Sequence, residues 1–236
     1  MKCRKSSSAR VAAGATIALV ACVLVACQPS ARRPAAPAAT VAPAVAAGRH
    51  LVLDPARSEL RVLAYRAGAL ARLGHNHVLI NRDLAGELWL AGESAGHVEL
   101  GVPVAAFRVD EPAARREEGA DFDTVPSPAD IDGTRHNLLG PRVLDASAHP
   151  EIRILGELAP GGASVAVRVV VRGVETPLAV PVSMQWRGAT LEADGAFTVR
   201  QSALGLEPFS VALGALQVRD DLTVRFHLVA VPAPGG

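Results

Sequence analysis

The sequence is poor in cysteine and in aromatic side chains, and both scarcities exclude classes of protein. Its three cysteines are Cys3, Cys22 and Cys27, and the first two lie in an apolar N-terminal segment typical of an export signal. A mature chain would therefore keep one cysteine, which excludes an intrachain disulfide and a zinc site built from cysteines. Aromatic residues are 3% of the chain, so any core must be built mainly from smaller aliphatic side chains.

Lysine is absent after Lys5, so arginine supplies every later positive charge. Residues 1–26 hold four of the 24 basic residues and no acidic residue, which leaves 20 basic against 23 acidic residues, a net charge of −3. A nucleic-acid-binding protein needs a basic surface, and the mature chain has no excess of positive charge to make one. We therefore expect no nucleic-acid partner.

Residues 1–26 predict a lipoprotein signal peptide. A basic start precedes an apolar run over residues 11–26, which is shorter than the roughly 20 residues that a membrane-spanning helix needs. The run ends in Leu24-Val25-Ala26-Cys27, which resembles a bacterial lipobox and implies an acyl anchor on Cys27. The alternative is an ordinary export signal with a chance cysteine.

This signal predicts a bacterial cell-envelope protein, lipid-anchored and facing the periplasm. Gln28 follows the cysteine, where aspartate is commonly associated with inner-membrane retention in enteric bacteria. We therefore expect the outer membrane rather than the inner. Residues 27–49 are rich in alanine and proline and predict a tether, residues 50–232 one domain with a sizeable core, and residues 233–236 a short tail.

Alternation of apolar and polar residues dominates the domain and predicts half-buried strands. It is clear in residues 60–65, 78–90, 98–104, 165–171, 178–186, 191–199 and 222–230, and residues 51–53 and 152–158 complete eight or nine strands. In residues 78–90 the even positions Val78, Ile80, Leu84, Leu88 and Leu90 are expected to face one way. Glycine-containing turns between the strands favour antiparallel neighbours, and Pro103 and Pro181 suggest edges or bulges.

The segment from Asp110 to Pro150 interrupts this rhythm and is too long for a hairpin loop. It contains helix-compatible stretches at residues 112–118 and 129–139, and such an excursion predicts a functional cap. An antiparallel sheet with one apolar face buries that face and loses its edges by closing into a barrel. We therefore predict an all-β fold, an extended antiparallel barrel of about eight strands with a short helical cap segment. Small inward side chains leave room for an apolar lumen.

Five stretches of the domain together resemble the YceI-like family. They are LDPARSEL, RVLDASAHPEIRI, VRGVETPLAV, FTVRQSALGLEPFS and VRDDLTVRFHLVAV, in this order across residues 51–231. The resemblance implies a lipocalin-like extended barrel, a bacterial envelope location, and binding of a polyisoprenoid or quinone-like chain. The segment GHNH resembles only a subset of the family, and residues 110–132 are longer and more acidic than the family implies.

That GHNH segment, residues 74–77, supplies the strongest polar site candidates: His75, Asn76 and His77. On a strand, the two imidazoles would project to the same side and could share one metal ion, with His136 or His149 as further ligands. Alternatively, Gly74 makes a turn, Asn76 satisfies backbone groups and the imidazoles bind carbonyls or water. A third interpretation is a polar contact to the headgroup of a ligand. We predict no metal.

Two other motifs are weaker. Residues 92–96, GESAG, match the nucleophile elbow of α/β-hydrolases with Ser94 as nucleophile, but that motif needs a strand followed by a helix. Here a second strand follows, so we predict a hairpin turn and no enzymatic activity. Asp121, Asp123, Asp130 and Asp132 suggest a calcium loop, but the twelve-residue pattern and its terminal glutamate are missing, so we expect solvated cap residues.

The sequence therefore predicts an envelope lipoprotein that binds or carries a long apolar ligand, without a cofactor and with its acyl anchor in the membrane. The alternatives are a metal-binding redox or enzymatic accessory that uses His75 and His77, and a structural interaction module with a filled core. A homo-oligomer stays open. The expected lumen residues stand on the apolar faces of their strands: Leu60, Val62, Val165, Val167, Val169, Leu178, Val180, Val182, Val224 and Phe226.

Overall fold

The computed structural model describes residues 48–92, 95–161 and 163–234. The predicted signal peptide, the predicted acylation site Cys27 and nearly all of the predicted tether lie outside these residues, as does Ser94. Within the described part of the chain, no helix has both the length and the apolar character to cross a membrane.

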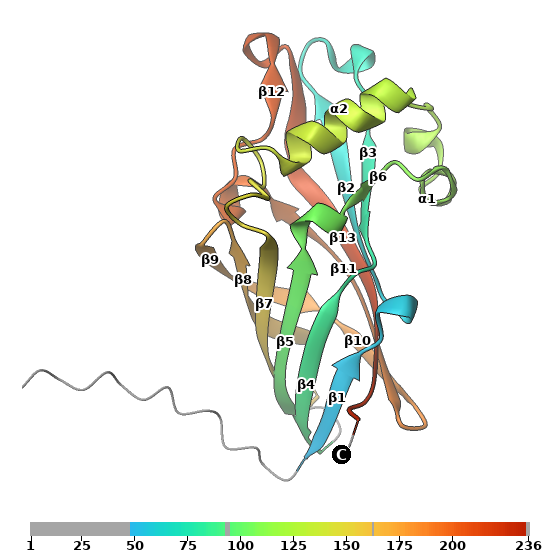
Figure 1. Ribbon diagram of the computed structural model, residues 1–236, viewed down its shortest axis with the longest axis vertical. Helices are drawn as coiled ribbons and strands as arrows, with labels where there is room; N and C mark the ends of the chain where they lie inside the picture. The colour runs from blue at the N-terminus through green and yellow to red at the C-terminus, as the bar shows by residue number, and fades with distance from the viewer. Residues whose placement is uncertain (1–47, 93–94, 162, 235–236) are drawn as a thin grey trace, which may run out of the picture. The chain divides into compact units, whose positions relative to one another are not determined.

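Antiparallel strands and two short α-helices make up the described domain (Figure 1). The strands are β1 (Arg49–Leu53), β2 (Glu59–Ala67), β3 (His77–Asn81), β4 (Ala85–Ala91), β5 (Ala95–Pro103), β6 (Arg108–Val109), β7 (Glu151–Leu158), β8 (Ser164–Val171), β9 (Val174–Pro181), β10 (Ser183–Arg187), β11 (Thr190–Arg200), β12 (Ser210–Val211) and β13 (Leu216–Pro232). The helices are α1 (Pro112–Glu117) and α2 (Pro128–Leu139), which confirm the two helical stretches predicted in the cap segment.

Several strands join end to end, because consecutive segments run in one direction along the same neighbour. β1 and β2 both pair with β13, at Leu53↔Ala230 and Glu59↔His227. β4 and β3 follow β1 and β2 in the same way, and β5 and β6 follow β4 and β3. β9 and β10 form a fourth joined pair. The four joined pairs and the four single strands β7, β8, β11 and β13 make eight long strands.

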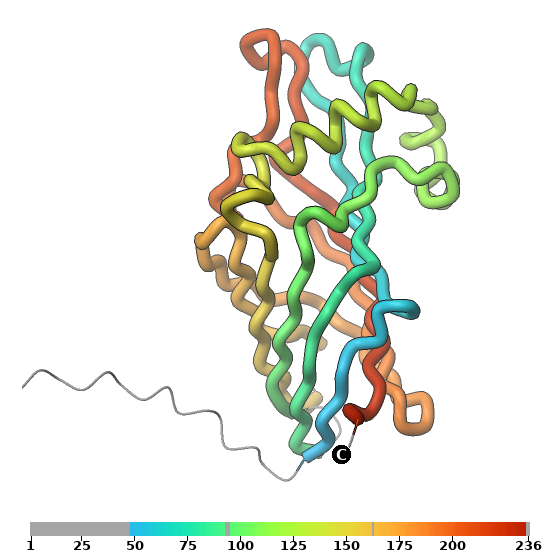
Figure 2. The backbone as a smooth tube through the Cα atoms, in the orientation of Figure 1, coloured from blue at the N-terminus to red at the C-terminus, as the bar shows by residue number. Residues whose placement is uncertain are grey.

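Hydrogen-bonded ladders join these eight strands into a closed ring. β5 pairs with β7, β7 with β8, and β8 with β9; the chain passes through Val182 into β10, which pairs with β11. β11 then pairs with β13 over ten residues, and β13 returns to β1 and β2. The predicted antiparallel barrel of about eight strands is confirmed. In Figure 2, β1, β4 and β5 converge toward the end at which β1 begins.

The two prolines predicted at edges or bulges mark changes of strand partner. Pro103 ends β5, after which the 3-10 turn η3 (Val104–Ala106) precedes β6. Pro181 ends β9, where the pairing changes from β8 to β11. At this joint Gly195 of β11 comes so close that a Cβ atom would collide with the Phe226 ring and the Pro181 carbonyl oxygen. The seam between β9 and β11 therefore depends on a residue without a side chain.

The prediction that the even positions of residues 78–90 all face one way is wrong. Val78 and Ile80 are fully buried on the outer side of β3, whereas Leu84 and Leu88 line the interior. The interruption between β3 and β4 shifts the alternation by one residue. The buried side chain of Asn81 stabilises this break, because it donates to the Pro103 carbonyl (2.8 Å) and accepts from the Asp83 N–H (3.0 Å).

The first part of the cap segment covers the outer face of β2 and β3. Leu63, Val78 and Ile80 pack there against Ala114 of α1 and Phe122 of the 3-10 turn η4 (Ala120–Phe122). At the rim of this contact, Glu118 accepts hydrogen bonds from two arginines of the barrel wall, Arg61 (2.7 Å) and Arg225 (2.6 Å). The cap thus forms a layer outside the barrel wall on this side, held by apolar contacts and bordered by ion pairs.

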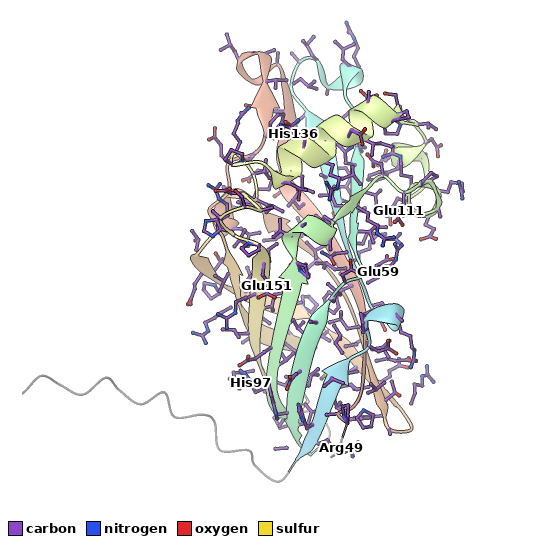
Figure 3. The ribbon with its side chains drawn as sticks, in the orientation of Figure 1. Arg49, Glu59, His97, Glu111, His136 and Glu151 are labelled. Carbon is purple, nitrogen blue, oxygen red and sulfur yellow. The ribbon has the colours of Figure 1, made fainter. Side chains whose placement is uncertain are left out.

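The second part of the cap segment, α2, lies across one end of the barrel, which we call the mouth (Figure 1). Ser127 and Asp130 form a reciprocal capping box at the start of this helix, which satisfies backbone groups that a helix end otherwise leaves unpaired. Ile131 and Leu138 pack on the core, and Thr134 between them also faces inward. Figure 3 labels His136 at the mouth and Arg49 at the opposite end of the barrel.

Candidate functional site

The interior of the barrel contains two cavities along its length. The upper cavity has a volume of about 280 Å³ and lies under α2 at the mouth; the lower cavity, deeper in the barrel, has a volume of about 150 Å³. Val224 borders both cavities. Ligand pockets in proteins have volumes of about 300–1,000 Å³, so the upper cavity alone lies just below this range, and the two cavities together fall within it.

The lower cavity is lined only by apolar side chains and glycine. Leucines and valines from all eight long strands supply most of the wall, together with Ile154, Met184, Ala193, Phe197 and Phe226. With no polar group to hold water in place, such a space favours an apolar occupant.

The structure brings nine of the ten predicted lumen residues to the cavities. Val62 lines the upper cavity and Val224 borders both. Those that line the lower cavity are Leu60, Val165, Val167, Val169, Val180, Val182 and Phe226. Leu178 lines neither cavity but packs against both neighbouring core clusters. That these residues contact a ligand stays a prediction.

Polar side chains gather only around the upper cavity. His75 and His77 line it together with Arg66, Thr134 and Asn137, and Gln201 and Gln217 complete this polar set. The side-chain amide of Gln201 already donates a hydrogen bond within the protein, to the Arg219 carbonyl (2.7 Å). Thr134 and Asn137 face the cavity from α2, so helix and barrel wall both contribute polar groups.

The GHNH segment follows a turn, and the side chain of Asn76 within it binds backbone groups. The 3-10 turn η2 (Ala71–Leu73) makes the bend, and Gly74 itself is extended, with φ of −108°. The amide oxygen of Asn76 accepts from the Arg66 N–H (3.0 Å), and its nitrogen donates to the Asp121 carbonyl (2.9 Å). Asn76 therefore ties this turn to β2 and to the cap.

His77 opens β3, and a buried carboxylate fixes its ring. Its Nδ1 lies 2.6 Å from Oδ2 of Asp110, whose side chain is 0% exposed. The other ring nitrogen, Nε2, lies 3.5 Å from the Thr134 hydroxyl at the cavity wall. An ionised carboxylate only accepts hydrogen bonds, so Nδ1 carries the ring hydrogen and donates a hydrogen bond to Asp110. The orientation of the ring thus leaves Nε2 on the cavity side.

Asp110 in turn belongs to a buried ionic cluster. Its Oδ1 accepts from Arg115 Nη1 (2.6 Å) and from the Val78 N–H (2.9 Å). Burial by itself raises the pKa of a carboxyl group, but the hydrogen bonds from His77, Val78 and Arg115 hold the pKa of Asp110 below its ordinary value. Asp110 also has a positive φ of 56°, a conformation that aspartate tolerates better than most residues.

Arg115 links this cluster to the cap. Its guanidinium donates to the carbonyl oxygens of Asn76 (2.7 Å), Phe122 (2.9 Å) and Thr124 (2.6 Å), besides Asp110. Across the described residues, every buried side-chain nitrogen or oxygen has a hydrogen-bond partner. A fully satisfied network of this kind makes the local structure rigid, and it positions His77 against the cavity.

The arrangement also bears on the metal interpretation. The rings of His75 and His77 are 6.2 Å apart between centroids, but His75 precedes β3 and Nδ1 of His77 is occupied by Asp110. His136 and His149 do not line the upper cavity. Over the described ranges there is no group of three or more histidine, cysteine, aspartate and glutamate side chains arranged to hold a metal ion.

The two weaker motifs are explained by local structure. β4 and β5 form an antiparallel pair up to Ala91↔Ala95, so a strand and not a helix follows the GESAG segment, as predicted. In the acidic segment, Asp130 belongs to the capping box of α2, and the Asp121 carbonyl accepts from Asn76.

Sequence reasoning missed Asp110, Arg115 and the polar residues Arg66, Thr134 and Asn137. Asp110 is 33 residues from His77 along the chain, and no local pattern connects them. The pattern that could have identified Thr134 and Asn137 is helical spacing, because Ile131, Thr134 and Leu138 share one helix face.

An eight-stranded antiparallel barrel with an apolar interior, capped by a helix at one end, is therefore the class of structure that the fold and site define. No family model matches the chain, and no curated protein matches its sequence. Among solved structures, BcnA of Burkholderia cenocepacia is similar, with a TM-score of 0.53 and 18% identity, covering 76% of this chain and 99% of BcnA.

Structures of a Campylobacter jejuni YceI protein also match. One has a TM-score of 0.44 and 7% identity, covering 63% of this chain and 81% of that chain. A mutant of the same protein has a TM-score of 0.46 and 7% identity, with coverage of 64% and 82%. The resemblance to the YceI-like family is thus confirmed at the level of the fold; the more specific likeness to a GHNH-containing subset stays a prediction.

Proposed function

We propose that this protein binds a long apolar molecule of isoprenoid type in its barrel and carries it without chemical change. The observation that supports this most is the separation of chemistry along the interior. The lower cavity is entirely apolar, and polar side chains occur only around the upper cavity. A molecule with a long apolar tail and one polar head matches this arrangement.

The apolar walls supply the affinity in this proposal. Burial of apolar surface contributes about 25 cal/mol per Å², so a tail that fills both cavities gains several kcal/mol after the cost of losing its own freedom. An occupant would also add dispersion contacts with the side chains that line the cavities.

The head of the ligand would lie beneath α2. Nε2 of His77, the hydroxyl of Thr134 and the amide of Asn137 face this space, and Asn137 makes no side-chain hydrogen bond to the described residues. Together these groups accept and donate hydrogen bonds, which suits the hydroxyl of a polyprenol or the oxygens of a quinone. The proposal assigns no metal, no cofactor and no reaction to the site.

The cellular setting is part of the proposal. We place the protein in a bacterial envelope, anchored through an acylated Cys27 and facing the periplasm, on the strength of the lipobox-like residues 24–27. Mass spectrometry of the N-terminal peptide tests the anchor: wild type should carry acyl groups on Cys27, and the Cys27→Ser variant should carry none.

Organic extraction of the purified protein, followed by mass spectrometry of the extract, tests the binding function. A co-purifying polyprenyl or quinone species at a constant ratio to protein is the expected result. Metal without lipid would instead support an accessory that uses His75 and His77, and an empty extract from protein that also fails to bind added polyprenol would support an interaction module.

A further inference from the structure

We infer that two loops at the mouth form a membrane-docking surface, which seats the mouth of the barrel on an anionic lipid bilayer. The loops comprise residues 68–75, with η2, and residues 210–217, with the 3-10 turn η6 (Ala212–Gly214). We call them the mouth loops. In Figure 1 both extend beyond α2 at the mouth end of the molecule.

The mouth loops carry large apolar side chains that the fold does not bury. Leu213 is 108% exposed, Leu73 is 64% exposed and Val211 is 41% exposed. Two of these side chains are leucines at loop tips, which are well suited to the interfacial region of a bilayer. Outside the mouth loops, the described structure has two other exposed large apolar residues, Val125 on the cap (86%) and Val174 (44%).

The backbone holds Leu213 outward at an energetic cost. Ala212 and Leu213 have φ of 50° and 53°, a left-handed conformation that costs roughly 1–2 kcal/mol per residue for L-amino acids. The two loops are joined, because the Leu70 N–H donates to the Ala215 carbonyl (2.7 Å). Such strain persists where the surrounding structure imposes it, and it occurs frequently at functional sites. Here the strain keeps an apolar tip in solvent.

Arginines around the mouth loops provide charge complementary to lipid phosphates. They are Arg66, Arg72, Arg142 and Arg219, and none of them takes part in an ion pair among the described residues. Three of them make other contacts: Arg66 donates to the Gly74 carbonyl (2.6 Å), Arg142 donates to the Ser210 carbonyl (3.1 Å), and Arg219 lies over the Tyr65 ring. By contrast, Arg61 and Arg225 on the barrel wall are neutralised by Glu118. Asp220, next to Arg219, is turned toward Ser202. Its carboxylate accepts hydrogen bonds from the Ser202 N–H (2.8 Å) and from the Ser202 hydroxyl (2.5 Å).

The upper cavity reaches the same loops. Gly74 and His75 line it from one mouth loop, and Val211, Leu216 and Gln217 line it from the other. A bilayer in contact with the loops therefore adjoins the cavity, so an apolar molecule dissolved in the bilayer could enter without crossing water. An anionic membrane explains the leucine tips, the arginines without ion pairs and the position of the cavity together.

Binding to vesicles tests this inference directly. A chain of residues 44–236 contains every strand, helix and core cluster described above and forms one compact unit, and it lacks the predicted acyl anchor that would mask docking. Circular dichroism first establishes that this chain is folded. We expect it to co-float with vesicles of phosphatidylcholine and phosphatidylglycerol and to bind pure phosphatidylcholine more weakly, with binding reduced by salt.

The variants separate the contributions. Leu73→Ser and Leu213→Ser should each lower the partition coefficient about ten-fold, whereas Val125→Ser, an equally exposed apolar control on the cap, should leave it unchanged. Arg72→Gln should weaken binding about five-fold to anionic vesicles, and Arg153→Gln, an exposed arginine on the barrel wall, should not. A Leu213→Trp variant should shift its emission to shorter wavelength on binding and be quenched by brominated lipid.

The outcomes that overturn the inference are equally specific. They are absence of binding to anionic vesicles, binding that Leu73→Ser and Leu213→Ser leave intact, and Leu213→Trp emission that vesicles do not change. Docking requires no bound ligand, so these results are independent of the extraction experiment and can fail while the binding function stands.

Discussion

Nδ1 of His77 and Oδ2 of Asp110 lie 2.6 Å apart, and this contact sets the orientation of the imidazole at the cavity wall. Asp110 is buried and also binds Arg115 and the Val78 N–H, so its carboxylate is a fixed acceptor. Nε2 of His77 is consequently directed toward Thr134 and the upper cavity. A buried aspartate beneath the cap thus determines the chemistry that the mouth presents.

Asp110→Asn should destabilise the protein by about 3 kcal/mol, because it leaves the buried charge of Arg115 without a partner. Chemical denaturation measures this, with Asp132→Asn on the exposed face of α2 as the matched control. Since the pKa of Asp110 is lowered in the folded protein, its contribution is present above the unfolded pKa and is lost as the pH falls. The difference between wild type and Asp110→Asn should therefore shrink in acid; a difference that stayed constant would contradict this account.

Val224→Trp should discriminate between ligands by length, because Val224 borders both cavities. Binding of a long polyprenol should fall at least ten-fold, whereas a short isoprenoid alcohol such as farnesol should still occupy the upper cavity. Fluorescence competition measures both affinities. The control is His227→Trp, on the outer face of the same strand, where the His227 ring is hydrogen-bonded to Asp194 (2.7 Å). Equal weakening of both ligands would show that the cavities do not act as one elongated site.

Gly195→Ala should destabilise the barrel by about 2 kcal/mol, because the new methyl group collides with the Phe226 ring and the Pro181 carbonyl. Thermal unfolding measures the change, and hydrogen exchange should show faster exchange along β10 and β11. Gly133→Ala on α2 is the control, since nothing lies within 4 Å of its Cβ position, and it should stabilise by up to about 1 kcal/mol. Unaltered stability of Gly195→Ala would mean that the seam is looser than described.

His97→Gln should reduce stability in a pH-dependent way. Burial opposes the charged form of His97, but hydrogen bonds to Glu99 (3.0 Å) and Glu157 (3.0 Å) raise its pKa above 6.5. A raised folded pKa means that the contribution is complete below the unfolded pKa and disappears as the pH rises through the folded pKa. Denaturation at several pH values should show a loss of up to about 1 kcal/mol near pH 5–6 that vanishes in mildly alkaline buffer. A larger loss at high pH would refute it.

The sequence predicts the barrel well because alternation is a local property. Val165, Val167 and Val169 alternate with outward residues over a whole strand, and the structure places all three at the lower cavity. The breaks between joined strands are not local. Residues 82–84 shift the alternation, so Val78 and Ile80 face the cap and not the lumen, and only their contacts with Ala114 and Phe122 reveal this.

The candidate site was predictable only in part for the same reason. The GHNH segment is conspicuous in sequence, but its partners Asp110 and Thr134 come from the cap, 33 and 57 residues away. The sequence allowed His75 and His77 as a metal pair, a turn or a headgroup contact, and it could not show that Nδ1 of His77 is already engaged. That distinction depends on tertiary packing.

The restriction of polar groups to the upper cavity also has a directional consequence. A head-and-tail molecule in this barrel has one favourable polarity: its tail points toward the end where β1 begins, and its head stays beneath α2. Under the proposed function, and with entry at the mouth, loading begins with the tail and unloading with the head. An acceptor of the ligand would meet the polar head first, while the apolar tail is still enclosed by the barrel.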